Sequence, residues 1–298
     1  MNPQAPLPKE FKIALAITIV VFIVWTFFLA RPQTVDDIKS FFPDTSPQGI
    51  LNTVERTVTN SGKLIANVDF SNAYLTNSGT IALTNNERAK AGLPTLVSNA
   101  KLMNIAKIRM NDMFAKGYFE HISSTGDSAA KEADANGYAY ITIGENIAMG
   151  NFKDDATLMQ AWMNSPGHRA NILRPTFTQL GVSVGKGMYN GKETWIAVQV
   201  FGKPLSSCPT VDTNLKSKIN VEQSQVDSGQ AQLAQIKTQL DTMATDPNVD
   251  GATYNQKIDE FNTLVTQINA LISEVKVDIA NYNVTVQAFN VCLASDSQ

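Results

Sequence analysis

The most constraining feature of this sequence is an unbroken heptad repeat in its C-terminal third. A second repeat, interrupted at Glu222 and Gly229, runs from Leu215 to Met243. In both, apolar residues recur at alternating steps of four and three, which places them along one side of a helix, as in a coiled-coil seam. The unbroken repeat consists of Tyr254, Ile258, Phe261, Val265, Ile268, Ile272, Val275, Ile279, Tyr282, Val286 and Phe289.

A cluster of turn residues, TDPNVDGA at 245–252, separates the two repeats and predicts that the helices fold back as an antiparallel hairpin. Cys208 and Cys292 lie equally far from residue 250, so this fold brings them together. A disulfide closing this loop of about 84 residues would stabilise the hairpin by roughly 4–5 kcal/mol. The matched distances favour the disulfide over two unpaired thiols. We expect residues 206–298 to form a coiled-coil hairpin closed by Cys208–Cys292.

A long apolar stretch near the N-terminus, Phe11 to Ala30, contains Lys12 as its only charged residue. As a helix it would be about 30 Å long, which matches the hydrocarbon core of a bilayer. A cleaved signal peptide is the alternative, but its apolar part is usually about 7–15 residues long and ends at small residues. Here Phe28 stands where a small residue is needed. We therefore favour a retained transmembrane anchor over residues 11–30.

The orientation of this anchor does not follow from charge alone. Lys9 and Lys12 are balanced by Arg31 and Lys39 beyond the stretch. The expected disulfide resolves the tie, because such bonds persist in oxidising compartments. We predict a single-pass cell-membrane protein with a cytoplasmic tail at residues 1–10 and everything after the anchor outside the cytoplasm.

Composition limits the possible partners of the chain. Its 298 residues carry a formal net charge of −3 and contain no run of lysine or arginine, so neither nucleic acid nor an anionic membrane surface is an expected electrostatic partner. Hydrophobic residues make up 43%, which is too many for a disordered chain. Residues 31–77 contain several prolines and are interpreted as a linker, with a short helix possible between Ile50 and Ile65.

Residues 78–205 show the mixed pattern of an α+β layered domain. One helix is expected to end at Gly92, and a second to begin after Ser98 as N-cap and to end at Gly117. Two strands flanking Asn190-Gly191 predict a closing β-hairpin. The second helix should bury a stripe formed by Leu102, Ile105, Ala106, Arg109 and Met113.

Five motifs follow one another in this region: NERAKAGLPTL, FEH, GENIA, WMNSPGHRANIL and WIAVQVFG. Over roughly residues 78–203 the chain resembles the CAP superfamily (cysteine-rich secretory proteins, antigen 5 and plant pathogenesis-related proteins) in its bacterial SCP-like form. The resemblance implies an α-β-α sandwich with a central cleft. Family members often line that cleft with two histidines and two acidic residues, and some hold a divalent metal there.

Carried over to this chain, the resemblance implies His121, His168 and Glu145 as cleft residues. The second acid falls at Ser165, or at Asn164 if the alignment slips, so this sequence departs from the four-residue pattern. Two imidazoles and a carboxylate suffice to bind a metal such as Zn²⁺ and leave room for water, with Glu145 as ligand or general base. The equal alternative is that Glu145 and one histidine form a hydrogen-bonded pair that holds loops together.

Serine catalysis is a weaker interpretation. Ser123, Ser124 and Ser165 lie near the histidines, but no nucleophile-elbow motif accompanies them. Ser165 precedes Pro166 and fits the role of a helix N-cap better.

Three functions remain in consideration. The leading hypothesis is a ligand-binding module that presents the cleft to a peptide, lipid or glycan in the cell envelope. The second is a metal-dependent hydrolase that uses His121, His168 and Glu145. The third is a structural or adaptor protein that captures an envelope partner through the helical hairpin.

Overall fold

The computed structural model describes residues 56–67 and 69–294 of the chain. The expected cytoplasmic tail at 1–10 and the expected membrane span at 11–30 lie outside the described residues. Within the described ranges, no helix combines the length and the apolar character that crossing a membrane requires.

A five-stranded sheet forms the centre of the α+β domain, with the strand order β1-β3-β5-β4-β2. The three central strands are antiparallel, whereas β1 pairs parallel to β3 and β2 pairs parallel to β4. The turn between β4 and β5 is the expected Asn190-Gly191, and both residues have positive φ, 50° and 80°. The strands are β1 (Thr57–Ile65), β2 (Val97–Ser98), β3 (Tyr140–Met149), β4 (Gln179–Tyr189) and β5 (Lys192–Pro204).

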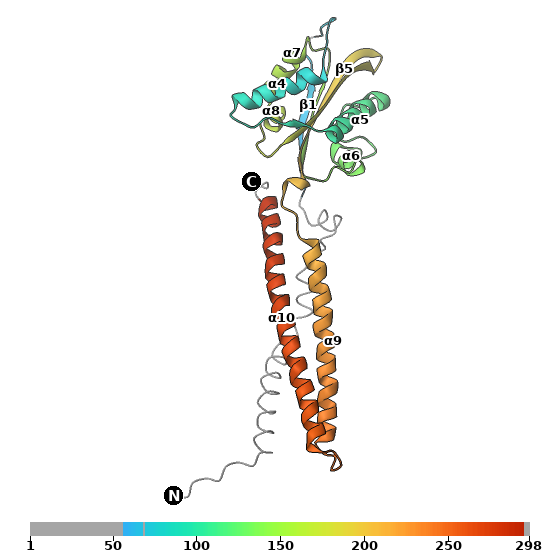
Figure 1. Ribbon diagram of the computed structural model, residues 1–298. Helices are drawn as coiled ribbons and strands as arrows, with labels where there is room; N and C mark the ends of the chain where they lie inside the picture. Colours follow the sequence, from blue (N-terminus) through green and yellow to red (C-terminus); the bar gives the residue numbers. More distant parts are fainter. Residues whose placement is uncertain (1–55, 68, 295–298) are drawn as a thin grey trace. The chain divides into compact units, whose positions relative to one another are not determined.

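Helices cover both faces of this sheet (Figure 1). Helices α5 (Ala100–Lys116) and α6 (Ala129–Ala135) lie on one face, and α4 (Asn77–Lys90), α7 (Asp155–Asn164) and α8 (Pro166–Ile172) lie on the other. Successive side chains of β5 point to opposite faces of the sheet and so contribute to two separate cores. Ile196, Val198 and Val200 pack toward α5 and α6, and Ala197 and Phe201 pack into the core on the other face. The expected mixed α+β fold is thus confirmed.

Helix α5 begins one residue later than expected. Its N-cap is Asn99, whose side chain accepts hydrogen bonds from the backbone N–H groups of Lys101 and Leu102. Gly117 ends the helix as expected, in the left-handed region at φ 67°. Arg109 is buried on the predicted apolar stripe, and this placement positions the candidate site described below.

The expected linker at 31–77 needs correction, because it contains strand β1. The short helix expected up to Ile65 is absent from the described residues, where Thr57–Ile65 is a strand. β-Branched residues at 57–59 favour this extended conformation, and the edge of β3 supplies backbone partners. The sequence signal was weak because Ser61 is the only buried residue of the strand, so no apolar alternation marks it.

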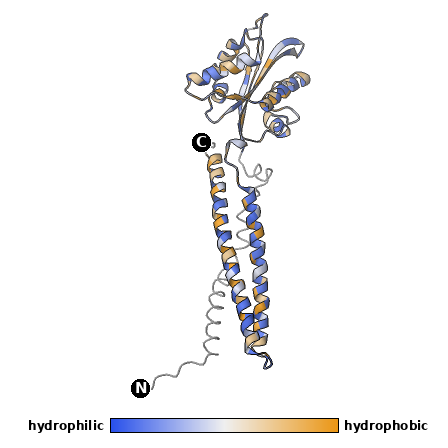
Figure 2. Cartoon of the chain, viewed as in Figure 1, coloured by the Kyte–Doolittle hydropathy of each residue, from blue (hydrophilic) through white to orange (hydrophobic). Residues whose placement is uncertain are grey.

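Two long helices follow the sheet, α9 (Thr213–Met243) and α10 (Gly251–Ala294), after a short 3₁₀ turn η1 (Leu205–Ser207). They run antiparallel (Figure 1), and the Cys208–Cys292 disulfide is present as expected. Apolar residues are interspersed among polar residues along both helices (Figure 2). In α10 every seventh residue of the predicted seam is buried: Phe261, Ile268, Val275, Tyr282 and Phe289.

The two interruptions in the first heptad repeat are buried as well. Gly229 faces α10 so closely that a Cβ atom there would lie 2.8 Å from Cδ1 of Ile268. Glu222 is bonded to Lys218 at 3.0 Å, and Lys218 also reaches Asp278 on α10 at 2.6 Å. Both positions therefore belong to the contact between the helices rather than breaking it.

Candidate functional site

A buried ion pair lies at the centre of the candidate site. Strand β3 places Glu145 toward α5, with its side chain fully buried. Its Oε1 accepts a hydrogen bond from Nε of Arg109 at 3.0 Å. Its Oε2 lies 2.7 Å from Nδ1 of His121, which carries the hydrogen because a carboxylate can only accept. Two of the predicted site residues, Glu145 and His121, are thus in direct contact.

Arg109 uses all five of its N–H groups in this region. Besides Glu145, they reach the hydroxyl of Tyr118 and the backbone carbonyls of Glu120, His121 and Asp127, at 2.8–3.1 Å. Burial lowers the pKa of the guanidinium, but the Glu145 carboxylate and Tyr118 outweigh that effect and leave the pKa raised. The arginine therefore fixes the loop that carries His121.

The sequence interpretation did not assign Arg109 to the site. A usable signal was present, since a charged residue on the apolar stripe of a helix requires a buried partner. The partner itself lies 36 residues away on β3, and no local spacing indicates it.

His168, the second predicted histidine, is completely buried on the inner side of α8. Its Nε2 donates to the carbonyl of Ile147 at 3.2 Å, and its Nδ1 accepts from the hydroxyl of Ser165 at 2.7 Å. Burial lowers the pKa of His168 to about 4, although the carbonyls of Ile147 and Gly62 oppose this shift. The resemblance implied that His168 lines a cleft, and the structure leaves none of its surface exposed.

Ser165 also differs from its expected role. It stands at the N-cap position of α8, but its side chain makes no capping hydrogen bond. The hydroxyl instead contacts His168, so the serine orients the imidazole ring. This leaves a serine–histidine pair without the carboxylate that orients the histidine in catalytic triads.

A chain of side-chain amides ties these groups to the opposite helix layer. Asn171 on α8 donates to the carbonyl of Glu145 and to the side chain of Asn146. Asn146 in turn donates to the carbonyl of His168 and to Gln199 on β5. Because all these polar groups are buried and bonded, they hold the site in one arrangement.

His121 is the member of the site with a free polar atom. Its side chain is 13% exposed, and its Nε2 is buried without a hydrogen-bond partner in the described part of the protein. Buried polar atoms are rarely left unpaired, so this nitrogen can bond a ligand that enters beside it.

The predicted three-residue metal set is not formed in this arrangement. Across residues 56–67 and 69–294, three or more histidine, cysteine, aspartate or glutamate side chains do not gather in a metal-binding group. Both oxygens of Glu145 are bonded to Arg109 and His121, and both ring nitrogens of His168 are bonded as well. The residues present therefore do not fit a metal held by His121, His168 and Glu145.

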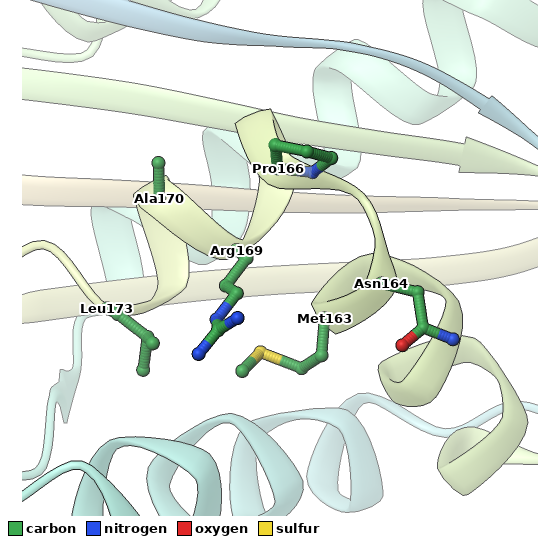
Figure 3. Close-up of a pocket in the computed structure, with 6 residues that line it drawn as sticks. All are labelled: Met163, Asn164, Pro166, Arg169, Ala170 and Leu173. Atoms are coloured by element: carbon green, nitrogen blue, oxygen red, sulfur yellow. The ribbon is translucent and has the colours of Figure 1, made fainter.

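A separate hollow of about 370 Å³ lies at the junction of α7 and α8 (Figure 3). Asn164, the alternative position for the second acid, lines this hollow and accepts a hydrogen bond from Gln160. The side chains of Met163 and Arg169 point away from the sheet in this view, whereas His168 lies on the buried face of α8. Asn164 thus lines the hollow, whereas Ser165 is bonded to the buried His168. The lining residues are Met163, Asn164, Pro166, Arg169, Ala170 and Leu173.

The sheet is covered by helices on both faces, with GENIA on β3 and the second histidine on α8. Residues 81–201 match the family model of the cysteine-rich secretory protein family, CAP. The match covers the range in which the motifs predicted a CAP domain, and this part of the chain is called the CAP domain below. Strand β1 and the helices α9 and α10 lie outside the matched residues.

Two curated relatives come from Bacillus subtilis (strain 168). The uncharacterized protein YkwD is 45% identical over 102 residues, which is 34% of this chain and 39% of that protein. The uncharacterized membrane protein YlbC is 34% identical over 107 residues, which is 36% of this chain and 31% of that protein. The chain thus spans less than two fifths of the length of either relative.

Solved structures of bacterial proteins also match part of the chain. An extracellular protein containing an SCP domain from Bacillus anthracis is 31% identical, with a TM-score of 0.37, and the match covers 42% of this chain and 39% of that one. A cysteine-rich secretory protein from Staphylococcus aureus is 25% identical, with a TM-score of 0.34, and the match covers 43% and 38%.

Proposed function

We propose that this chain is a membrane-anchored, extracytoplasmic binding module whose CAP domain holds a peptide, lipid or glycan of the cell envelope. The observation that carries the proposal is the pairing of Glu145 with both Arg109 and His121. A carboxylate engaged at both oxygens maintains the shape of a site and is a poor general base or metal ligand. The unpaired Nε2 of His121 then supplies a contact for a bound molecule.

The location outside the cytoplasm is supported by three observations. The Cys208–Cys292 disulfide is typical of oxidising compartments. CAP proteins are typically extracellular, and one relative is named a membrane protein. The apolar stretch at residues 11–30 supplies an anchor of suitable length, with residues 1–10 in the cytoplasm.

The hydrolase hypothesis finds less support. Metal-assisted hydrolysis requires an open coordination position at a formed metal site. Serine catalysis would rely on the Ser165–His168 pair, but a histidine whose pKa is lowered to about 4 is a weak base at neutral pH. Its Nε2 also contacts a backbone carbonyl where a catalytic triad has a carboxylate.

The adaptor hypothesis is favoured by one specific feature of α10. Val277, Val284 and Val291 recur at seven-residue spacing and are 59–64% exposed, so they form a stripe on the side of the helix that α9 leaves uncovered. Exposed apolar stripes at this spacing are suited to a further helix. In contrast, Ile268 is buried within the helix pair and is not available to a partner.

The proposed function can be tested with the full chain in lipid nanodiscs. We would titrate it with vesicles of neutral and anionic lipid, with solubilised peptidoglycan fragments and with a peptide library, and would monitor cleavage in the same samples. Saturable binding without cleavage, weakened by His121→Ala and unchanged by Lys90→Ala at an exposed position on α4, is the expected result. Turnover that His168→Ala abolishes in a folded protein would contradict it.

A Zn²⁺ titration distinguishes the metal-dependent hydrolase hypothesis from the proposed binding function. Calorimetry on the chelator-stripped chain should show the same weak heat for the wild type and for the double variant His121→Ala/His168→Ala, because Glu145 is already paired. Saturable one-to-one binding that is lost in the double variant would restore the metal-dependent hydrolase hypothesis.

A further inference from the structure

Strand β1 is attached to the CAP domain mainly through its backbone pairing with β3. It is the edge strand of the sheet, it runs parallel to β3, and it precedes the range that matches the CAP family. Ser61 is its only buried residue, and its apolar residues Val58 and Ile65 are 46% and 58% exposed. Leu64 packs only partly against the core. The strand therefore contributes little apolar burial to the domain.

The same strand lies directly against the candidate site. The hydroxyl of Ser61 donates to the backbone carbonyl of Glu145 at 3.2 Å, and the side chain of Asn171 donates to the carbonyl of Thr59 at 3.3 Å. A Cβ atom on Gly167 of α8 would lie 3.5 Å from the backbone N of Gly62 and from Cα of Ser61. Strand β1 thus covers the part of β3 that carries Glu145, beside the buried face of α8.

The pairing of β1 with β3 is irregular at this point. The register shifts between Asn60 and Lys63, which leaves Ser61 and Gly62 as a bulge against the site. On either side of the bulge the strand is held by exposed ion pairs, Lys63 with Glu120 at 2.6 Å and Arg56 with Asp134. Exposed pairs of this kind contribute little, and Arg56 also lies 4.9 Å over the ring of Tyr140 on β3. The backbone ladder supplies the rest of the attachment.

We propose that β1 is a displaceable strand, and that the edge of β3 it covers is a binding site for an extended polypeptide. This inference rests on the proposed binding function and names peptide as its ligand. Edge strands present rows of unpaired N–H and C=O groups, and extended peptides bind by completing that ladder. A lipid or a glycan does not provide a matching row of backbone groups.

The contacts of β1 define the kind of peptide that fits. Such a peptide would run parallel to β3, as β1 does. It would have small residues such as Ser and Gly at the bulge beside α8 and a basic residue on each side of the bulge. Those basic side chains face Glu120 and Asp134, so the rim of the site is acidic. Binding requires β1 to leave, and the apparent affinity is therefore reduced by the fraction of molecules in which β1 stays bound.

The test uses the full chain and a fluorescent peptide with the sequence of residues 56–66, RTVTNSGKLIA. The variant Arg56→Glu/Lys63→Glu repels the acidic rim and loosens β1, but it leaves the β3 edge unchanged. The matched control, Lys90→Glu/Lys186→Glu, makes the same charge change at two exposed ion pairs away from β1. A scrambled peptide of the same composition controls for charge.

Fluorescence anisotropy should show the peptide binding about tenfold more tightly to Arg56→Glu/Lys63→Glu than to the wild type. The control variant should behave as the wild type, and the scrambled peptide should bind to none of them. Hydrogen exchange at the amides of residues 142–149 should rise in the loosened variant and fall again when the peptide is added. Equal binding to both double variants would overturn the proposal.

Hydrogen exchange also decides the case in which no peptide binds. If these amides stay protected in Arg56→Glu/Lys63→Glu and in Ser61→Pro, β1 is a fixed strand and the proposal is overturned. If they become exposed and still bind no peptide, the edge is not a peptide site, and the proposal fails again. Binding of vesicles or peptidoglycan would then leave the wider binding function intact. Peptide that binds and is cleaved would instead contradict that function while retaining the site.

Discussion

The CAP domain and the helix pair α9–α10 bury their interiors in different ways. In the helix pair, buried side chains recur every seven residues along α10. The charged side chain of Lys218 is exposed and forms ion pairs with Glu222 and Asp278. In the CAP domain, a two-sided sheet encloses Arg109 and Glu145 completely. Similar apolar contacts therefore repeat along the first region, whereas the second adds to its two apolar cores a few buried polar contacts that each occur once.

A second buried arginine of the CAP domain also bonds several backbone carbonyls. Arg88 on α4 is buried, and burial lowers its pKa. It donates to the backbone carbonyls of Pro94, Ile172, Arg174 and Phe177, and so fixes the segment between α8 and β4. Buried arginines here organise loops, and removing one leaves several acceptors unpaired at once. The comparison predicts that the two regions respond to different changes.

The largest effect is expected in the helix pair on removal of its covalent closure. Cys208→Ser/Cys292→Ser opens a loop with a sequence separation of 84 residues. In the chain-entropy model this costs about 4–5 kcal/mol. Hydrogen exchange should show the loss in α9 and α10 only, and chemical reduction of the wild type should reproduce it. Equal loss of protection in β3 and β5 would show that the two regions unfold as one.

Arg109→Leu should have a comparable effect in the CAP domain. It leaves the buried carboxylate of Glu145 without its guanidinium partner, which costs about 3–5 kcal/mol. Denaturant unfolding followed by tryptophan fluorescence measures it, since Trp162 and Trp195 both lie in this domain. The control Arg169→Leu, at an exposed position on α8, should stay within about 0.5 kcal/mol. A loss of less than about 1 kcal/mol in the free energy of unfolding for Arg109→Leu would contradict the stabilising role assigned to this residue.

The CAP domain should also lose stability on acidification, through His168. Its pKa is lowered to about 4 from an ordinary value of 6.5, so between these values the unfolded chain binds a proton that the folded protein does not. The stabilisation is complete above pH 6.5 and declines as the pH falls toward 4, by up to about 3 kcal/mol. Denaturant midpoints from pH 7 to pH 4 measure the slope. His168→Asn should flatten it, and an unchanged slope in that variant would refute the assignment.

The smallest effect is expected at a single seam position of the helix pair. Ile268→Ala should cost about 2 kcal/mol, at the lower end for core truncations, because only one facing helix covers the site. Gly229→Ala adds a Cβ where the isoleucine side chain lies at 2.8 Å, so it should recover part of the loss when combined with Ile268→Ala. Thermal unfolding of the two single variants and the double variant measures this coupling. Strict additivity would show that the two residues do not share a contact.

Where a local pattern repeats, the sequence was a sufficient guide. The heptad spacing indicated the two C-terminal helices and their buried positions, and the symmetry of the cysteines indicated the disulfide. The Asn190-Gly191 turn and the CAP motifs likewise depend on neighbouring residues, and they located the β4–β5 hairpin and the domain. Even the burial of Arg109 followed from its place on the apolar stripe of α5.

The tertiary structure alone decided how the site residues meet. Arg109 reaches Glu145 across 36 positions of sequence, and Ser61 reaches the Glu145 carbonyl across 84. Strand β1 had no apolar alternation to reveal it, because its pairing depends on a backbone ladder with β3 that any extended segment can form. The motifs identified His168 as a site residue, but its burial and its weak basicity result from the packing of α8 against the sheet. Contacts between distant segments leave no periodic trace in the sequence, and for that reason only the folded chain determines them.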